Sequence, residues 1–348
     1  MKKILIFDST LRDGSHSLKQ QLELATIRDY CDIVDNSGVD SVIVGHGNGL
    51  GASSLQIGFS KYTDKEMLIE AKSHLKKTKL GIYMIPGFGT IKDNLLEAID
   101  IGVDIFKIGS HCTEADTTKE HIEFLRNHNK QVYGILMMSH MASPKRLLEE
   151  VLKMESYGAF GVILMDSAGF MLPTDVKERI QLLTSKSNIK IGFHAHNNLG
   201  CAVANTLMAL DCGASIVDAT VRGFGAGAGN CQLETLVAIM KRIEKEFDIN
   251  LYKLLDASEM IKKIAPLETG VDTISIMMGV AGIFSAFKNR IRAVAKEFDV
   301  DERDIILELE KKKAIGGQED MIIESAMSIV ERNNNKKDKA TSFLETLS

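Results

Sequence analysis

The feature that most constrains the fold of this chain is an alternation repeated eight times over about 245 residues. Short apolar runs rich in β-branched residues alternate with longer amphipathic stretches, and Gly, Asp or Ser separate them. The apolar runs predict strands at residues 3–8, 41–45, 80–85, 105–109, 131–137, 161–165, 189–194 and 215–219. The amphipathic stretches predict helices at residues 22–36, 63–75, 91–101, 118–127, 144–157, 173–185, 200–212 and 231–245.

Eight β-then-α units are the number that a (β/α)8 TIM barrel of the α/β class requires. Continuous apolar strands are also typical of a parallel sheet that is buried on both faces. An open doubly wound sheet would tolerate the same alternation, but its G-x-G-x-x-G fingerprint after the first strand is missing. The sequence therefore favours the barrel. Thr90 and Ser143, the latter followed by Pro144, carry the signals of helix N-termini.

The strand signal ends near Leu251, and the pattern that follows is helical. It predicts helices at residues 274–287, 290–298, 302–310 and 320–331, before a polar stretch at 332–339. We therefore expect a TIM-barrel catalytic domain over residues 1–250 and a small all-helical domain over residues 251–335. Residues 336–348 are expected to form a polar, frayed tail.

Charge and cysteine content exclude several classes of protein. The chain has 42 Lys and Arg against 47 Asp and Glu, a net charge of −5, so it lacks the basic balance of a nucleic-acid-binding protein. No apolar stretch approaches the roughly 20 residues of a transmembrane helix, and the first residues do not resemble a signal peptide. The five cysteines are scattered and include no C-x-x-C pair, which favours reduced thiols in the cytoplasm.

Reactive side chains gather where the predicted strands end, which is where a TIM barrel carries its chemistry. Six of the nine histidines lie at such positions, which are His16, His46, His111, His140, His194 and His196. Scattered histidines would not show this bias. The sequence therefore predicts an active site at the C-terminal end of the barrel.

The His194-Ala-His196 pair is the sharpest signal of metal binding. Residues two apart on a strand face the same side, so both imidazoles can reach one metal ion. Asp13, after the first strand, would add the carboxylate of a two-histidine, one-carboxylate site. The alternative is a pair of strand-end histidines that only form hydrogen bonds.

The neighbouring polar residues each have two interpretations. Arg12 is either an ordinary ion-pair partner or a planar fork that holds a carboxylate or enolate oxygen near the metal. His16 is either a general base or a loop histidine on the surface. Asp166-Ser167 forms a helix cap or presents a hydroxyl to a substrate carboxylate. The glycine-rich residues 223–230 either bind a phosphate or approach the metal site closely.

These motifs resemble a known family. Residues 8–16 (DSTLRDGSH) and 194–199 (HAHNNL) are similar to the metal-dependent barrels of the HMG-CoA-lyase-like superfamily. Four further stretches narrow the resemblance to 4-hydroxy-2-oxovalerate aldolases with their helical communication domain, namely residues 110–116, 136–141, 223–230 and 316–322. The resemblance runs from about residue 3 to about residue 332.

The resemblance implies a class II aldolase that cleaves a 4-hydroxy-2-oxoacid such as 4-hydroxy-2-oxovalerate to pyruvate and an aldehyde, through a metal-bound pyruvate enolate. It implies that a divalent ion, commonly Mn²⁺ with Mg²⁺ or Co²⁺ as alternatives, is bound by Asp13, His194 and His196. Arg12 would steady the enolate and His16 would be the catalytic base. No lysine stands in a convincing Schiff-base position, with the possible exception of Lys107 inside the fourth strand.

The substrate contacts implied by the resemblance involve Ser167, which would meet the pyruvate carboxylate, together with His194 and Phe284. Phe284 stands where the family usually carries a tyrosine, and phenylalanine has no hydroxyl to donate. This departure bears on the aldehyde and the stereochemistry that the site accepts. Asn197 replaces a more usual histidine.

The family resemblance also implies an oligomeric protein and, from members that degrade aromatic compounds, an acylating acetaldehyde dehydrogenase partner that receives the aldehyde. Two other functions stay open from the sequence. One is an acyl-CoA condensing or lyase barrel of the same superfamily, which would share the metal ligands. The other is a binding barrel without turnover.

Overall fold

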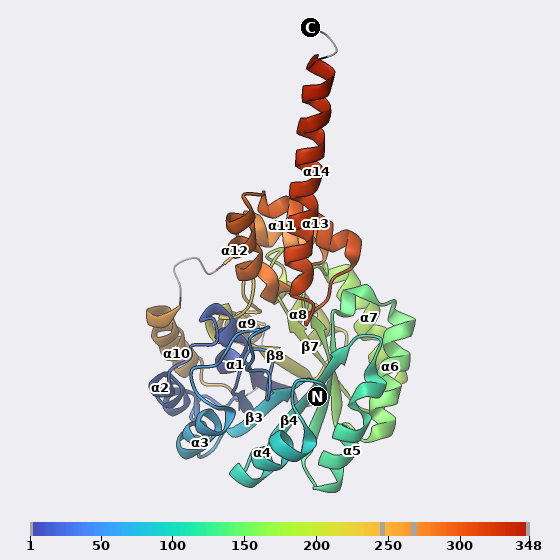
Figure 1. Cartoon of the computed structure of the whole chain (residues 1–348). Coiled ribbons are helices and arrows are strands. Elements are labelled where there is room, and N and C mark those ends of the chain that lie inside the picture. Colours follow the sequence, from blue (N-terminus) through green and yellow to red (C-terminus); the bar gives the residue numbers. More distant parts are fainter. Residues whose placement is uncertain (1–2, 244–247, 266–269, 346–348) are drawn as a thin grey trace.

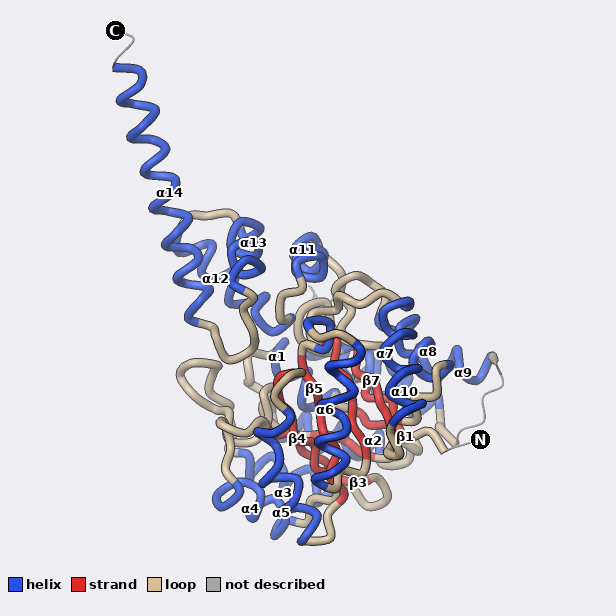
Figure 2. The backbone as a smooth tube through the Cα atoms, turned by 90° about the vertical axis from the view of Figure 1, so that its right-hand side faces the viewer, coloured by secondary structure: helices blue, strands red, loops and turns tan. Residues whose placement is uncertain are grey.

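A closed barrel of eight parallel strands forms the centre of the molecule (Figures 1 and 2). The structure is a computed structural model that describes residues 3–243, 248–265 and 270–345, with side chains up to residue 335. Each strand pairs with its neighbours in the sequence, and β8 closes the barrel onto β1. The strands are β1 (Leu5–Asp8), β2 (Ser41–Ile43), β3 (Lys79–Met84), β4 (Ile105–His111), β5 (Gln131–Met137), β6 (Gly161–Asp166), β7 (Lys190–Ala195) and β8 (Ile216–Ala219). The predicted TIM barrel is confirmed.

Helices cover the outside of the barrel (Figure 2). They are α2 (Leu24–Val34), α3 (Asp64–His74), α4 (Leu96–Ile101), α5 (Lys119–Asn127), α6 (Pro144–Tyr157), α7 (Pro173–Lys186), α8 (Ala202–Asp211) and α9 (Leu233–Arg242). Every predicted helix of the barrel is therefore present, although the end of the 231–245 prediction lies outside the described residues. Within 91–101 the first turn is a π-helix, η1 (Ile91–Leu95), which continues into α4.

The predicted helix caps are present in the structure. The Thr90 hydroxyl accepts the N–H of Asp93, and the Ser143 hydroxyl accepts the N–H of Arg146. Pro144 occupies the first turn of α6, where its missing N–H costs nothing. These local signals fix where the outer helices begin, and hence how long each strand-to-helix loop is.

Two apolar layers hold the barrel together. Side chains that point inward from the strands, such as Phe7, Tyr133 and Ile163, form a small cluster inside the barrel. Outward-pointing side chains such as Val42 and Phe106 form a larger cluster with the surrounding helices. Because these strands are buried on both faces, they appear as continuous apolar runs in the sequence.

Helix α10 (Leu251–Ile264) belongs to the barrel by its packing. It contacts α2 and α9, and its Leu254 and Ala257 are part of the larger apolar cluster. From Ile274 onward the buried apolar residues form a separate cluster. We therefore propose a domain boundary between α10 and α11, later than the division expected near residue 250.

The second domain is helical and lies at one end of the barrel (Figure 1). It consists of α11 (Thr273–Ala281), the 3-10 turn η5 (Ser285–Phe287), α12 (Lys288–Phe298), α13 (Glu302–Lys312) and α14 (Asp320–Glu345). The predicted helix 274–287 is broken at Gly282, whose φ of +66° lies in the left-handed region that ends helices. The small helical domain after the barrel is confirmed.

The C-terminal segment corrects the expectation of a frayed tail. Helix α14 continues without interruption to Glu345 and projects from the body of the molecule (Figure 1). Residues 346–348 of the expected tail lie outside the described residues. A polar composition therefore did not prevent helix formation, since Asn, Lys and Glu cost a helix less than about 1 kcal/mol per residue. No helix within the described ranges is long and apolar enough to cross a membrane.

Candidate active site

The segment after β1 forms a short helix that the sequence analysis did not predict. Helix α1 (Thr10–Ser17) carries Arg12, Asp13 and His16, and its first six residues are buried. Glycine is a poor helix former, so Gly14 weakened the helix signal of this segment in the sequence. Glycine is required there because a Cβ would lie only 2.3 Å from the ring of Phe224. Three of the predicted site residues therefore stand on one rigid turn at the C-terminal end of the barrel.

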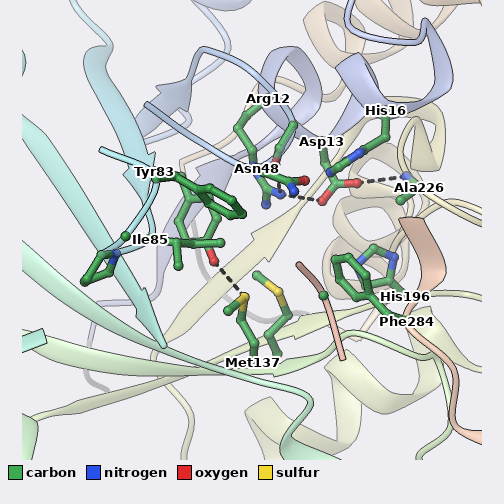
Figure 3. A pocket seen from close by; sticks show the side chains of 16 residues that line it. Arg12, Asp13, His16, Asn48, Tyr83, Ile85, Met137, His196, Ala226 and Phe284 are labelled. Atoms are coloured by element: carbon green, nitrogen blue, oxygen red, sulfur yellow. Dashed lines mark hydrogen bonds and ion pairs between the residues drawn. The ribbon is translucent and has the colours of Figure 1, made fainter. Parts of the chain in front are cut away.

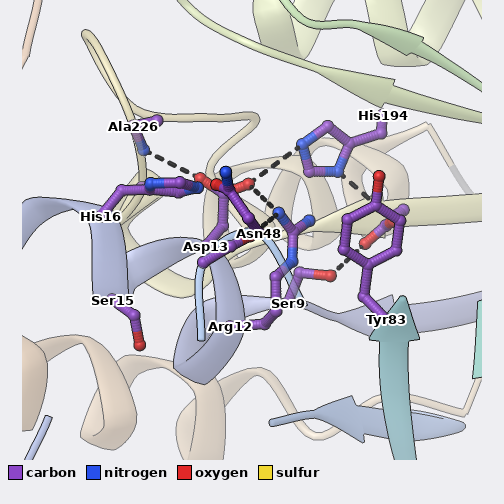
Figure 4. Close-up of polar contacts among 12 residues, drawn as sticks. Ser9, Arg12, Asp13, Ser15, His16, Asn48, Tyr83, His194 and Ala226 are labelled. Atoms are coloured by element: carbon purple, nitrogen blue, oxygen red, sulfur yellow. Dashed lines mark hydrogen bonds and ion pairs between the residues drawn. The ribbon is translucent and has the colours of Figure 1, made fainter. Parts of the chain in front are cut away.

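Asp13, His194 and His196 lie together, with their ligand atoms within 4.8 Å of one another. His194 Nε2 is 3.7 Å from Asp13 Oδ2, and the two imidazole rings are 5.1 Å apart (Figure 4). All three residues are at most 3% exposed. A carboxylate and two imidazoles at this spacing are a ligand set for a divalent transition metal.

The protonation states of Asp13 and His196 suit a bound cation. Burial alone would raise the pKa of Asp13, but the positive charge of Arg12, with its Nη1 2.8 Å from Asp13 Oδ2, holds that pKa well below its ordinary value. Burial lowers the pKa of His196 to about 3, so its imidazole is neutral at pH 7. Metal ligands must be deprotonated, and Asp13 and His196 already are.

Two of the histidine nitrogens in the triad have no partner in the structure. His194 Nε2 and His196 Nδ1 are buried without a hydrogen-bond partner, whereas His194 Nδ1 lies 3.4 Å from Asp218 Oδ2. Buried polar atoms without partners are rare and costly. Their orientation around Asp13 shows that the residues present fit a metal ion.

Arg12 stands beside the triad with free donors. Its Cζ lies 5.0 Å from the centre of the Tyr83 ring, and Nη1 donates to the carbonyl of Gly47 at 3.2 Å. Its Nε and Nη2 are buried without a hydrogen-bond partner. A fixed guanidinium with two free N–H groups can bind a carboxylate or an enolate oxygen.

A cavity of about 330 Å³ opens above these residues. Its polar side comes from α1 and from His196, which follows β7, and its apolar side from β3, β5 and the second domain (Figure 3). The lining residues are Arg12, Asp13, His16, Gly47, Asn48, Tyr83, Ile85, Pro86, Gly87, Phe88, Met137, Met165, His196, Ala226, Phe284 and Gly316. This volume suits a small molecule with a polar end and a less polar end.

His16 and Phe284 face this cavity from different domains (Figure 3). Burial lowers the pKa of His16, although the nearby Asp13 charge opposes the shift, so the imidazole is neutral and able to accept a proton at pH 7. Phe284 packs its ring against Gly316, where a Cβ would lie 3.0 Å from the ring. The barrel thus supplies the charged groups and the second domain supplies an apolar wall.

Ser167 and His194 do not line the cavity. Ser167 is buried, and its hydroxyl accepts the N–H of Met138 at 2.9 Å. His194 is fully buried, and its Nε2 contacts Asp13, which does line the cavity. The structure therefore brings His194 to the ligand triad, while the expected contact of Ser167 with a substrate stays a prediction.

The glycine-rich loop after β8 packs on the triad. The N–H of Ala226 donates to Asp13 Oδ1 at 2.8 Å, and the N–H of Ala228 donates to the Asn198 side chain at 3.0 Å. Gly225 is in close contact as well, because a Cβ there would lie 2.6 Å from Asp13 Oδ1. Of the two interpretations of this loop, close approach to the metal site agrees with the structure, since these N–H groups serve side chains.

Several residues near the triad were not predicted from the sequence. Tyr83 lies inside β3, where an aromatic residue reads as ordinary core. Asn230 ends the glycine-rich loop, and both polar atoms of its buried amide lack a partner, so its oxygen could complete a metal shell. Asp218 lies in β8, and nothing in the sequence distinguishes it from an ordinary strand residue. Only Asn230 had a signal in the sequence, because it follows four closely spaced glycines.

Three of the strand-end histidines serve the fold instead of the site. His46 Nε2 lies 3.1 Å from the Gly58 carbonyl, and His140 Nε2 lies 3.2 Å from the Gly282 carbonyl in the second domain. His111 Nδ1 lies 2.9 Å from the Thr113 hydroxyl. The bias of histidines toward strand ends therefore pointed to the end of the barrel where the triad and the cavity lie, although these three histidines are not part of the triad.

The fold and this triad define a TIM barrel of a known class, with a candidate metal site at the C-terminal end of its strands. Residues 3–261 match the HMGL-like family model, and residues 269–331 match the model of the DmpG-like communication domain. The proteins named 4-hydroxy-2-oxovalerate aldolase from Pectobacterium atrosepticum and Spirochaeta aurantia are 49% and 48% identical to this chain. These matches cover 97% and 95% of this chain, and 99% and 97% of the two relatives.

The chain therefore belongs to the 4-hydroxy-2-oxovalerate aldolase family of HMGL-like barrels. Solved structures agree with the fold. The N-terminal domain of a putative aldolase from Bacteroides vulgatus matches with a TM-score of 0.72 at 22% identity, covering 85% of this chain and 98% of that one. The carboxyl transferase domain of Rhizobium etli pyruvate carboxylase matches with a TM-score of 0.81 at 15% identity, over 95% of this chain and 61% of that one.

Proposed function

We propose that this protein is a divalent-metal-dependent, class II aldolase that cleaves a 4-hydroxy-2-oxoacid, such as 4-hydroxy-2-oxovalerate, to pyruvate and an aldehyde. The convergence of Arg12 with Asp13, His194 and His196 at one cavity is the observation that carries this proposal. The full-length relatives bear the name of this activity. An acyl-CoA condensing barrel and a binding barrel without turnover are not favoured, because the relatives are named as aldolases.

The residues divide the reaction between them. A Mn²⁺ ion held by Asp13, His194 and His196 would supply Lewis-acid chemistry, which draws electrons toward the 2-keto oxygen. His16 takes the proton from the 4-hydroxyl, which allows the C3–C4 bond to break and the aldehyde to leave. The electron pair of that bond forms the pyruvate enolate, which takes up a proton at C3 to give pyruvate. The free Nε–H and Nη2–H groups of Arg12 stabilise the negative charge of the enolate.

The remaining contacts suit a ketoacid. Tyr83 stacks on the Arg12 guanidinium and keeps its fork at a fixed angle to the cavity. The opposite wall, with Ile85, Met137 and Phe284, is apolar and supports binding of the aldehyde substituent. Ser167 is proposed to meet the pyruvate carboxylate, which would require its hydroxyl to leave the N–H of Met138. The net charge of −5 makes the local positive charge of Arg12 and the cation necessary for an anionic substrate.

The direct test is pyruvate release from a panel of 4-hydroxy-2-oxoacids, measured with and without added Mn²⁺ after treatment with a chelator. We expect cleavage that depends on Mn²⁺. The Asp13→Asn variant keeps the size of the side chain but loses its charge, so we expect it to lose metal binding and at least 100-fold in activity. Undiminished activity in this variant, or release of free CoA from acyl-CoA substrates in place of pyruvate release, would reject the proposed function.

We further propose a partner and a location. The match of residues 269–331 to a DmpG-like communication domain supports an acylating acetaldehyde dehydrogenase as the partner in an oligomeric complex. Co-expression followed by size-exclusion chromatography tests this, and independent elution of the two proteins would reject it.

All five cysteines, each within the described part of the chain, are free thiols, which supports a cytoplasmic location.

A further inference from the structure

A buried ionic cluster lies inside the barrel below the ligand triad. Lys107 of β4 reaches Asp218 of β8, with 2.5 Å between Nζ and Oδ2, and donates to the Ser9 hydroxyl at 3.0 Å. The Ser9 hydroxyl donates to the other oxygen of Asp218 at 2.6 Å. All three residues are completely buried, and none lines the cavity.

Lys107 therefore does not act as a Schiff-base lysine. Its amine is enclosed between Asp218 and Ser9, away from the residues that line the cavity. A buried ion pair is also a poor source of stability, because the cost of removing two charges from water offsets their attraction. Apolar residues fill the other interior positions of this barrel, such as Phe7, Ile105 and Ile163. Stability alone therefore does not explain why this ion pair is buried here.

The cluster touches the metal triad through His194. In the β7–β8 pairing His194 stands opposite Asp218, and its Nδ1 lies 3.4 Å from Asp218 Oδ2. Its other nitrogen, Nε2, points to Asp13 (Figure 4). A neutral imidazole carries one N–H, and a histidine that binds metal usually directs that N–H to a carboxylate while the other nitrogen binds the ion.

Lys107 supplies the positive charge that compensates the carboxylate of Asp218. Its Nζ contacts Asp218 Oδ2, and both side chains are completely buried. Without Lys107, a carboxylate in the barrel interior would lack its main compensating charge. The lysine therefore keeps this carboxylate an acceptor.

We propose that the Lys107–Asp218 pair is a positioning device for His194. Asp218 holds the Nδ1–H of His194, so the ring is fixed with a bare Nε2 toward Asp13 and His196. Lys107 and Ser9 in turn fix Asp218. Neither Lys107 nor Asp218 touches the substrate. This inference rests on the proposed metal site.

The test is the charge-neutral double variant Lys107→Met/Asp218→Asn, which removes both charges together and so avoids leaving one of them unpaired. Mn²⁺ affinity is measured by calorimetry on chelator-treated protein, with thermal unfolding measured in parallel. We expect a loss of about 10–100-fold in affinity with a melting temperature near that of the wild type. A double variant that binds Mn²⁺ within about threefold of the wild type overturns the inference, because the pair would then be structural only.

A matched control and a wild-type measurement complete the test. Glu150 is also a fully buried carboxylate with cationic partners, but it lies on α6 outside the barrel, so Glu150→Gln is expected to leave Mn²⁺ affinity unchanged. If the double variant does not fold, ¹⁵N-histidine NMR of the wild type decides the question, with His194→Gln used for assignment. A His194 ring with its proton on Nδ1 supports the inference, and a proton on Nε2 overturns it. Failure of the wild type itself to bind Mn²⁺ would instead refute the proposed function.

Discussion

The substitution Gly225→Ala adds one methyl group at the point where the glycine-rich loop meets the metal triad. Gly225 is buried and does not have a positive φ, so alanine suits its backbone. The new Cβ would lie 2.4 Å from Asn230 Nδ2 and 2.6 Å from Asp13 Oδ1. Ordinary contact begins near 3.4 Å, so each of these atoms must retreat by about 0.8–1.0 Å.

The expected effects follow from that displacement. Metal–ligand distances hold to about 0.2 Å, so a shift of Asp13 by nearly 1 Å should lower Mn²⁺ affinity at least tenfold. Misplacing a catalytic site by about 1 Å typically costs on the order of 100-fold in rate, which sets the expected loss in kcat/KM. Overpacking of this size should lower the free energy of unfolding by about 1–3 kcal/mol.

The assay combines Mn²⁺ calorimetry, pyruvate release coupled to lactate dehydrogenase and thermal unfolding. Gly134→Ala is the matched control, because its Cβ would lie 2.2 Å from Met154 Sδ in the layer between sheet and helices, away from the metal triad. We expect that control to lose stability but to keep its Mn²⁺ affinity. If Gly225→Ala binds Mn²⁺ and releases pyruvate as the wild type does, the contact between the loop and Asp13 does not position the ligand, and the reasoning fails.

Two further predictions concern the residues that face the cavity. Burial lowers the pKa of His16 below 6.5, and only the neutral ring accepts a proton, so kcat/KM should stay constant near neutral pH and fall at acidic pH with a midpoint below 6.5. His16→Ala should lower kcat about 10²–10⁴-fold and remove this acidic limb, whereas a midpoint above 6.5 would contradict the assignment. Phe284→Tyr adds a donor worth about 0.5–1.5 kcal/mol, so the preference between the two C4 enantiomers of the substrate should change roughly 2–10-fold. Chiral analysis of aldol products measures that preference, and an unchanged ratio would show that position 284 does not contact the substrate hydroxyl.

Much of the fold could be predicted because its signals are local. The apolar runs gave all eight strands of the barrel, and Pro144 with Ser143 fixed the start of α6 at the predicted residue. The His194-Ala-His196 spacing likewise predicted two imidazoles on one side of a strand. Each of these inferences depends only on residues within a few positions of one another, where backbone geometry is the same in any fold.

Local sequence patterns gave wrong or missing predictions where packing between distant residues determines the structure. Helix α1 was missed because Gly14 has a low helix propensity, yet the ring of Phe224 requires glycine there. The break at Gly282 divides a stretch that appears as one apolar helix in the sequence. The helical course of α14 to Glu345 was not expected from its polar composition. Packing and helix continuity determine where these helices begin and end, and the local sequence pattern carries no information about either.

By itself, the sequence determined the barrel, the end of the barrel at which the candidate site lies and the residue types proposed to hold the ion. The tertiary structure alone decided which partners those residues meet. Closure of β8 onto β1 brings Asp13 within 3.7 Å of His194, and Lys107 reaches Asp218 only across the barrel interior. The physical reason is the sequence separation over which each interaction acts, because periodicity and capping involve only residues that are near neighbours in the chain. Contacts between strands far apart in the sequence depend on register and closure, which exist only once the whole barrel has formed.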